Sequence, residues 1–180
     1  MTSSRGPAWL TDADLLAGRL VGQGLSGDAA SAKARLFVKT ARTLLASASC
    51  GNESEFLAFF VPGRIEVLGK HTDYAGGSSM VAAAERGFCF VAAAREDDQI
   101  SVTSAATGES VSFHFNPEVV PRRGRWSNYP ATVVRRLARN FADCRRGADV
   151  AFDSDLPAAA GMSSSSALIT GVFLALAEVN

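Results

Sequence analysis

Five short runs with the character of β-strands follow one another between residues 56 and 115. They read FLAFFV, SSMVAAAE, GFCFVAAA, ISVTS and SVSFHF. The turn signals Pro62-Gly63, Gly76-Gly77, Asp97-Asp98 and Thr107-Gly108 separate them. Strands that succeed one another without intervening helices do not build a regular βαβ sheet. The expected fold class is therefore α+β, with one mixed or antiparallel sheet.

Helical patterns flank these runs on both sides. Apolar residues recur at helical spacing over residues 9–48, after Thr11 or Asp12 as a cap and again after Gly27, so residues 1–52 are expected to be a helical leader packed on a domain of residues 53–180. A helix at 127–146, a strand at 148–155 and a helix at 163–180 are expected next. Pro130 fits only the first turn of its helix. The last helix is apolar nearly all round, which is typical of a helix buried between other elements.

Charge and cysteine content exclude several classes of partner. Lys plus Arg and Asp plus Glu balance at 18 each, so no overall field attracts nucleic acid or an anionic membrane. The three cysteines are an odd number without a CxxC pair, which argues against a disulfide framework and a zinc site. No signal peptide or long apolar window is apparent. We therefore expect a cytoplasmic protein whose partner is a small molecule, not a nucleic acid or a membrane.

The stretch DLPAAAGMSSSSALITG has the character of an anion site. A strand, a turn of small residues and four serines opening a helix would present unpaired backbone N–H groups at the positive end of a helix dipole. The small residues allow phosphate oxygens to approach, and the serine hydroxyls add donors and an oxygen ligand for Mg²⁺. The alternative is a plain serine-capped helix. The stretch is not a Walker loop, because the Gly-Lys-Ser ending is missing.

A second polar stretch, VPGRIEVLGKHTDYAGG, lies at residues 61–77. Arg64 can neutralise an oxyanion or a phosphoryl group, and His71 and Asp73 can present hydrogen-bonding groups to a polyhydroxylated ligand. The alternative is a solvated hairpin turn with Tyr74 packed beneath it.

These motifs together resemble a known family. PGRIEVLGKHTDYAGG is similar to the galactokinase signature, LPAAAGMSSSSAL resembles the phosphate loop of the GHMP kinases, and RWSNYPATVVRRL resembles the galactokinase segment in which Trp-x-Asn-Tyr precedes a helix. The three matches follow the family's order from residue 56 onward. The resemblance implies the N-terminal domain of a GHMP kinase, a ribosomal-protein-like two-layer α/β sandwich, and an ATP- and Mg²⁺-dependent sugar kinase acting at the anomeric hydroxyl.

The resemblance also assigns roles to residues. Arg64 would stabilise transition-state charge, His71 and Asp73 would bind sugar hydroxyls, and Tyr74 would support their turn. Ser165 would be the Mg²⁺ ligand. The loop wrapped around the ATP phosphates would consist of Ala159, Ala160, Gly161, Met162, Ser163, Ser164 and Ser165.

Two further residues, one aromatic and one with a hydroxyl group, complete the nucleotide site that the resemblance implies. Trp126 would form an aromatic wall near the adenine, with a plain core aromatic as the alternative. Ser104 would line the same site.

Two positions depart from the family's pattern. Lys70 replaces the family's sugar-binding Glu, and Glu66 replaces its Asn. An ammonium only donates hydrogen bonds and carries the opposite charge to a carboxylate, so the recognised group must differ from that of galactose or Lys70 must be turned aside. Lys70 would then meet an acceptor such as the carboxylate of an acidic sugar, or pair with Glu66.

The family's catalytic Asp and its third, glycine-rich motif follow the phosphate-loop helix, beyond Asn180. We therefore expect these residues to be the N-terminal portion of a longer kinase whose C-terminal half packs on this chain, and to be inactive alone. The alternatives are a GHMP kinase for an acidic sugar or other small alcohol, and a non-catalytic sensor of sugar and ATP.

Overall fold

Six strands form one mixed sheet in the computed structural model, which describes residues 2–47, 54–69, 72–122, 124–157 and 161–180. Within these residues the strand order is β1-β2-β3-β6-β4-β5. The strands are β1 (Thr2–Arg5), β2 (Glu55–Leu68), β3 (Met80–Ala94), β4 (Gln99–Ser104), β5 (Ser110–His114) and β6 (Ala148–Ser154). β4 and β6 pair in parallel, and the other neighbours are antiparallel. The expected α+β class with a mixed sheet is confirmed.

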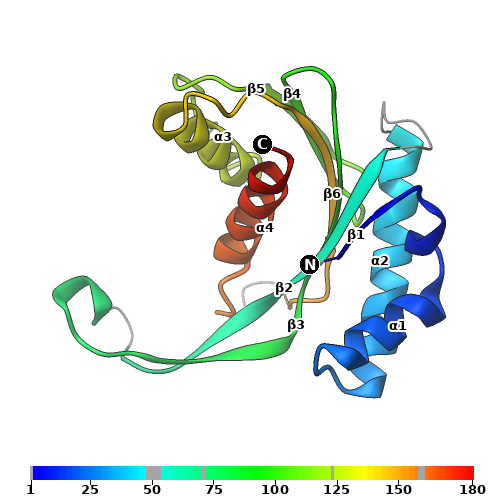
Figure 1. Ribbon diagram of the computed structural model, residues 1–180. Helices are drawn as coiled ribbons and strands as arrows, with labels where there is room; N and C mark the ends of the chain where they lie inside the picture. Colours follow the sequence, from blue (N-terminus) through cyan, green and yellow to red (C-terminus); the bar gives the residue numbers. More distant parts are fainter. Residues whose placement is uncertain (1, 48–53, 70–71, 123, 158–160) are drawn as a thin grey trace.

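Helices cover both faces of this sheet (Figure 1). One face carries α3 (Asn128–Asn140) and α4 (Ser164–Val179), and the other carries α1 (Ala13–Gly22) and α2 (Gly27–Ser47). Short 3-10 turns lie at η1 (Ala8–Leu10) and η2 (Asp73–Ala75). The sheet with α3 and α4 is the expected two-layer sandwich, and the leader helices add a third layer. Strand β1 also comes from the leader, at the edge of the sheet beside β2.

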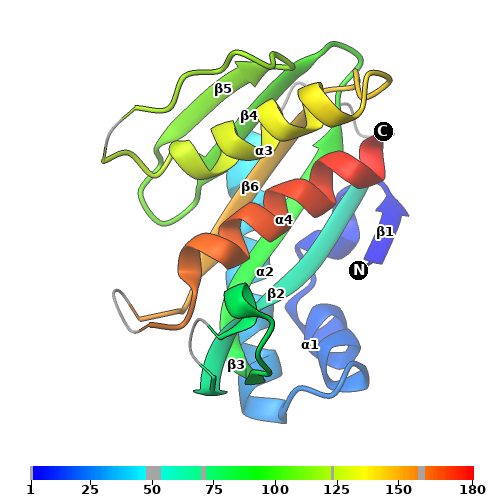
Figure 2. The same ribbon diagram turned by 90° about the vertical axis from the view of Figure 1, so that its left-hand side faces the viewer.

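Two apolar cores follow from this layering. On the α2 face, Ala34, Phe37 and Leu44 are buried against the sheet, because their spacing places them on one side of the helix. On the other face, Phe90 stacks on Phe59 with ring centroids 5.3 Å apart, beneath α4. Figure 2 looks onto this face, with α4 lying across the middle strands of the sheet.

Gly171 brings α4 close to the sheet. A Cβ atom at this position would lie 2.1 Å from two atoms of the Phe90 ring, well inside contact distance. The helix is therefore seated against β3 at a point where only glycine fits.

Three element boundaries differ from the sequence expectation. β2 does not end at Pro62-Gly63 but continues to Leu68 through a register shift between Pro62 and Arg64, because a bulge absorbs the irregular residues. The two strands expected at 78–85 and 87–94 are one strand, β3.

The third difference concerns α3, which ends at Asn140 instead of 146. Phe141 adopts an extended backbone, and its side chain, expected on the apolar face, is 56% exposed. The turn that follows directs Cys144 into the core instead.

Candidate functional site

The β2–β3 hairpin extends from the body of the sheet (Figure 1), and Arg64 lies on its β2 strand. It follows the bulge at Pro62 and pairs with Ala83 on β3. Its side chain is 53% exposed, so the guanidinium can reach a ligand in solvent. Residues 61–77, which were expected to form one polar turn, therefore form two parts. These are a strand that carries Arg64 and a separate loop at the hairpin tip.

The backbone of Arg64 contacts the serine-rich loop directly. Its N–H donates to the carbonyl oxygen of Met162 at 3.1 Å. Gly63 allows this approach, because a Cβ atom there would lie 2.6 Å from Leu156 Cδ2 and 3.4 Å from the Met162 oxygen. The two motifs singled out in the sequence thus meet in the structure, although almost a hundred residues separate them.

Glu66 lies beside Arg64 on the same strand. A Glu66 carboxylate oxygen is 3.6 Å from Arg64 Nη2, and the Glu66 side chain is half-buried. Residues two apart on a strand share a face, which explains the pairing. The Glu66 carboxylate therefore lies next to the proposed phosphoryl-binding cation.

The hairpin tip is organised by Thr72, a residue that the sequence analysis did not single out. Its Oγ1 lies 2.8 Å from the carbonyl oxygen of Gly69 and 3.0 Å from that of Ser78, so its single proton is shared between these two acceptors, and the Thr72 carbonyl accepts from the Gly77 N–H at 2.8 Å. A threonine in a Gly-bounded turn was the available signal, since its hydroxyl bonds nearby backbone groups. Thr72 closes the base of the loop that carries the proposed sugar-binding residues.

Several predicted site residues lie outside the description. Lys70, His71, Ala159 and Ala160 fall outside the described residues, and the Asp73 side chain is likewise not described, although its backbone belongs to η2. Tyr74 is 83% exposed, so it is not packed beneath the turn as the hairpin alternative supposed.

The serine run begins α4 as expected. Ser163 is the N-cap and adopts a left-handed backbone with φ of 56°, which is uncommon for a residue other than glycine. Its side chain makes no capping hydrogen bond, while its carbonyl accepts from the Ala167 N–H at 3.0 Å. Backbone strain of this kind is found at ligand-binding sites. Ser163 is therefore not a plain serine cap.

The first turn of α4 suits an oxyanion. Gly161 is exposed, and Ser163, Ser164 and Ser165 are half-buried. The N-terminal turn of a helix carries partial positive charge and N–H groups that lack helical partners. These donors fit phosphate oxygens, and the Ser165 hydroxyl is an oxygen of the type that Mg²⁺ accepts.

Ser104 and Trp126 lie near the end of the sheet from which this loop departs. Ser104 ends β4 opposite Phe152 of the parallel strand β6, and its Oγ accepts from the Thr107 N–H at 3.4 Å. Trp126 packs edge-on against Phe152 with centroids 5.6 Å apart, and its Nε1 donates to Glu109 Oε2 at 2.9 Å. Trp126 thus makes the contact expected of a plain core aromatic. It also lies at the end of the sheet where an aromatic wall near the adenine is expected.

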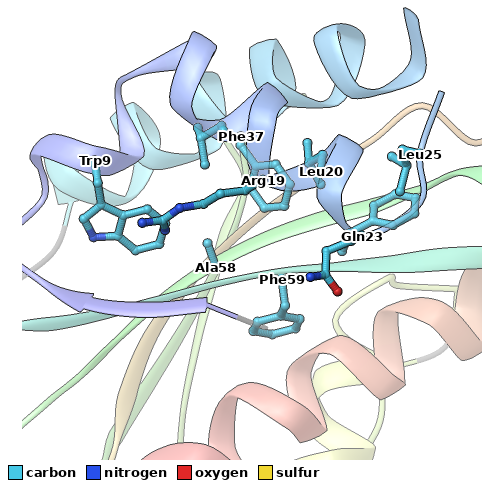
Figure 3. A pocket seen from close by; sticks show the side chains of 10 residues that line it. Trp9, Arg19, Leu20, Gln23, Leu25, Phe37, Ala58 and Phe59 are labelled. Carbon is cyan, nitrogen blue, oxygen red and sulfur yellow. The ribbon is translucent and has the colours of Figure 1, made fainter. Parts of the chain in front are cut away.

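A separate cavity of about 210 Å³ lies on the leader side of the sheet (Figure 3). It is enclosed by α1, α2 and β2, with the Arg19 guanidinium 5.1 Å from the Trp9 ring centroid. Its lining is mostly apolar. The cavity contains none of the residues predicted for the site.

Two other features are absent from the described residues. No cluster of three or more His, Cys, Asp or Glu side chains there could hold a metal ion. In the same residues, no helix is long and apolar enough to cross a membrane.

Two family models match the chain. Residues 47–94 match the galactokinase galactose-binding signature, and residues 128–180 match the N-terminal domain of the GHMP kinases. The two matched ranges contain both halves of the site, Arg64 and the serine loop.

Curated relatives include galactokinases of two bacteria. The galactokinase of Actinobacillus pleuropneumoniae serotype 5b (strain L20) is 34% identical over 109 residues, which are 61% of this chain and 28% of the relative. That of Haemophilus influenzae (strain PittGG) is 31% identical over 116 residues, 64% of this chain and 30% of the relative. The chain therefore spans less than a third of the length of these relatives.

Solved structures show the same fold. Lactococcus lactis galactokinase complexed with galactose superposes with a TM-score of 0.57 at 32% identity, over 65% of this chain and 31% of that one. Methanococcus jannaschii mevalonate kinase gives a TM-score of 0.57 at 16% identity, over 68% and 39% of the two chains, which supports the fold alone.

Proposed function

Because this chain belongs to the GHMP kinase superfamily and is galactokinase-like, we propose that it supplies the sugar- and phosphate-binding surfaces of an ATP-dependent sugar kinase that phosphorylates the anomeric hydroxyl. The observation that carries the proposal is the hydrogen bond from the Arg64 N–H to the Met162 oxygen. It holds the galactokinase-like segment against the serine loop, as transfer from a bound phosphate to a bound sugar requires.

Arg64 is the proposed catalytic residue of this chain. Its half-exposed guanidinium, which lies beside Glu66, would stabilise the charge that develops on the transferred phosphoryl group. Phosphoryl transfer depends mainly on positioning and charge stabilisation, so a fixed cation beside the phosphate loop is the expected contribution.

The serine loop is the proposed site of the ATP phosphates. Residues 159–165 would hold them through backbone N–H groups and serine hydroxyls, and Ser165 would provide one ligand to Mg²⁺. When bound, Mg²⁺ neutralises charge on the phosphates. Ser104 and Trp126 would line the nucleoside side, at the same end of the sheet.

The hairpin tip is the proposed sugar side. His71 and Asp73 would bind sugar hydroxyls, and Thr72 would support the loop that carries them. Lys70 favours a second candidate, a kinase for an acidic sugar or other small alcohol. An ammonium group forms an ion pair with a substrate carboxylate, but it cannot accept hydrogen bonds from sugar hydroxyls as a Glu side chain does.

A further portion of the kinase is proposed to pack on this chain and to supply the catalytic base. Apolar side chains remain exposed in the hairpin and on the outer side of α4, among them Leu68, Met80 and Phe173. Exposed apolar side chains of this size are a common feature of surfaces that another part of a protein covers. The relatives' greater length agrees with this reading.

A cytoplasmic location would suit ATP-dependent chemistry and the free thiols of Cys89 and Cys144.

The test is a sugar-dependent ADP-release assay on the full-length protein with ATP and Mg²⁺. The panel contains neutral hexoses, uronic acids and heptoses. Turnover with a neutral hexose supports the galactokinase-like proposal, and turnover with uronic acids alone supports the second candidate. Sugar-dependent ATP binding without turnover would identify a sensor instead and would overturn the proposal of catalysis.

A further inference from the structure

A buried cation of the leader connects to the start of the serine loop. Lys33 lies on α2 with only 2% of its side chain exposed, and its Nζ contacts Asp155 Oδ2, directly after β6. Lysine is almost never this buried unless it is paired. On the apolar face formed by Ala30, Ala34 and Phe37, it is the one charged side chain among the buried residues of α2.

Asp155 extends this contact into the sheet. Its second oxygen, Oδ1, accepts from the Gly87 N–H at 2.9 Å, and its own N–H donates to the Gly87 oxygen at 3.3 Å. Gly87 pairs with Pro62 of β2, next to the bulge that precedes Arg64. One carboxylate thus joins α2, β3 and the exit of the loop.

The chain then runs from Asp155 into the contacts already described. Leu156 packs against Gly63, and further on the Met162 oxygen accepts from the Arg64 N–H. The path from Lys33 to the catalytic segment therefore consists of direct contacts between described residues. α2 is itself anchored near its start, where Glu85 of β3 accepts from the Ser26 N–H at 3.0 Å.

The energetics of this partly buried ion pair point to positioning, because Lys33 is buried while Asp155 is 30% exposed. Desolvation of the Lys33 charge offsets much of the attraction, so an apolar side chain of similar volume would often stabilise a fold as well. What the ion pair adds is a directional, charge-assisted contact. Such a contact is most useful where the exit point of a loop must be fixed.

We propose that Lys33 is a positioning residue for the phosphate site. Through Asp155 it fixes where the serine loop leaves β6, and thereby the placement of that loop relative to Arg64. This inference rests on the proposed function for its catalytic consequence. Its structural half, the coupling of Lys33 to the loop and to Arg64, can be measured independently.

The first test is amide hydrogen exchange on the full-length protein. Lys33→Met should accelerate exchange at the Gly87 and Arg64 amides about tenfold or more, because both hydrogen bonds belong to the structure that Asp155 holds. The Val102 amide in β4 should change little. Lys33→Arg should restore most of the protection. Lys39→Met is the matched control, since Lys39 on the same helix pairs with Asp153 at 2.7 Å but is half exposed.

The second test is steady-state kinetics of the same variants. Lys33→Met should raise KM for ATP and lower kcat by about 10- to 100-fold, the loss expected when reacting groups are misplaced by about 1 Å. KM for the sugar should stay within a factor of about two. The double variant Lys33→Met/Asp155→Asn, which leaves no unpaired buried charge, should fold and show the same kinetic loss.

The outcomes separate this inference from the proposed function. Unchanged exchange at Gly87 and Arg64 in an active enzyme would overturn the inference alone. Equal acceleration throughout the sheet would also overturn it, because it would indicate lost stability only. Accelerated exchange at those amides in a protein whose wild type has no sugar-dependent turnover would overturn the proposed function, and with it the catalytic role of Lys33.

Discussion

At the scale of single residues, Arg64 carries most of the proposed chemistry. Replacing it with Lys keeps the charge but removes the planar fork that fits a phosphoryl group. We expect kcat of the full-length protein to fall about 10²-fold or more. Stability should change little, because an exposed ion pair such as Arg64–Glu66 contributes about 0–1 kcal/mol.

The control for Arg64 is Arg139→Lys. Arg139 is similarly exposed and paired with Glu118 at 3.2 Å, away from the serine loop. The kcat of the Arg139→Lys variant should equal that of the wild type. A kcat for Arg64→Lys within a factor of about two of wild type would remove Arg64 from the transition state.

Lys70 is proposed to determine the class of sugar. Lys70→Glu restores the acceptor that the galactokinase pattern has at this position, so the ratio of kcat/KM for neutral hexoses to that for uronic acids should rise about tenfold or more. The sugar panel measures it. An unchanged ratio would show that Lys70 takes no part in recognition.

Asp97 makes a specific contribution to acid stability. The hydrogen bond from Arg95, at 2.7 Å, lowers the pKa of Asp97 from its ordinary value of 3.8 to about 2. A carboxyl with a depressed folded pKa stabilises the protein above its unfolded pKa, and this stability is lost as pH falls from about 4 to about 2.

The check is urea unfolding of wild type and Asp97→Asn at pH 6 and pH 3. The difference in unfolding free energy between the two pH values should be smaller in the variant. Glu118→Gln serves as the exposed control. Equal pH dependence in wild type and Asp97→Asn would contradict the role assigned to the Arg95 contact.

At the scale of elements, the seating of α4 on the sheet fixes where the serine loop ends. Gly171→Ala would place a methyl group 2.1 Å from the buried Phe90 ring. Such overpacking costs about 1–3 kcal/mol, against a gain in helix propensity of about 1 kcal/mol. We expect a net loss of about 1 kcal/mol in unfolding free energy, measured by urea denaturation.

Gly18→Ala is the matched control for Gly171. Gly18 lies in α1, where an added Cβ meets no atom within 4 Å. The substitution should stabilise the protein by about 0.4–1 kcal/mol. If Gly171→Ala were as stable as Gly18→Ala, the close seating of α4 against Phe90 would be contradicted.

Elements with strong local signals were predictable from the sequence. β4, β5, β6 and α4 lie within one or two residues of their expected positions, because periodicity and turn residues mark their ends. β1 was not predictable, since its four residues become a strand only by pairing with β2. The passage of β2 through Pro62-Gly63 was also missed, because a bulge depends on the partner strand.

The site shows the same division between local and long-range information. Arg64 and the serine run could be found by residue type and spacing, and their meeting depends on the bond between the Arg64 N–H and the Met162 oxygen. Lys33 carried a usable signal, a charge on the apolar face of a helix. Its partner Asp155 could not be inferred, because the two residues meet only when α2 packs across the sheet.

At the scale of the whole molecule, this chain is proposed to present one wall of a site. The β2–β3 hairpin and the start of α4 lie at the same end of the sheet (Figure 1), and the Arg64 N–H donates to the Met162 oxygen between them. Apolar side chains of the hairpin and of α4, such as Leu68 and Phe173, are exposed. An additional part of the kinase, packed on these surfaces, would complete the site and shield the transfer from water.

The most direct test of the account is the identity of the product. Phosphorus-31 NMR of the full-length protein, incubated with ATP, Mg²⁺ and its preferred sugar, detects where the phosphate goes. We expect a new phosphate ester on the anomeric carbon, formed in step with ADP. ADP formed with free phosphate only, or a phosphate ester at another carbon, would contradict it.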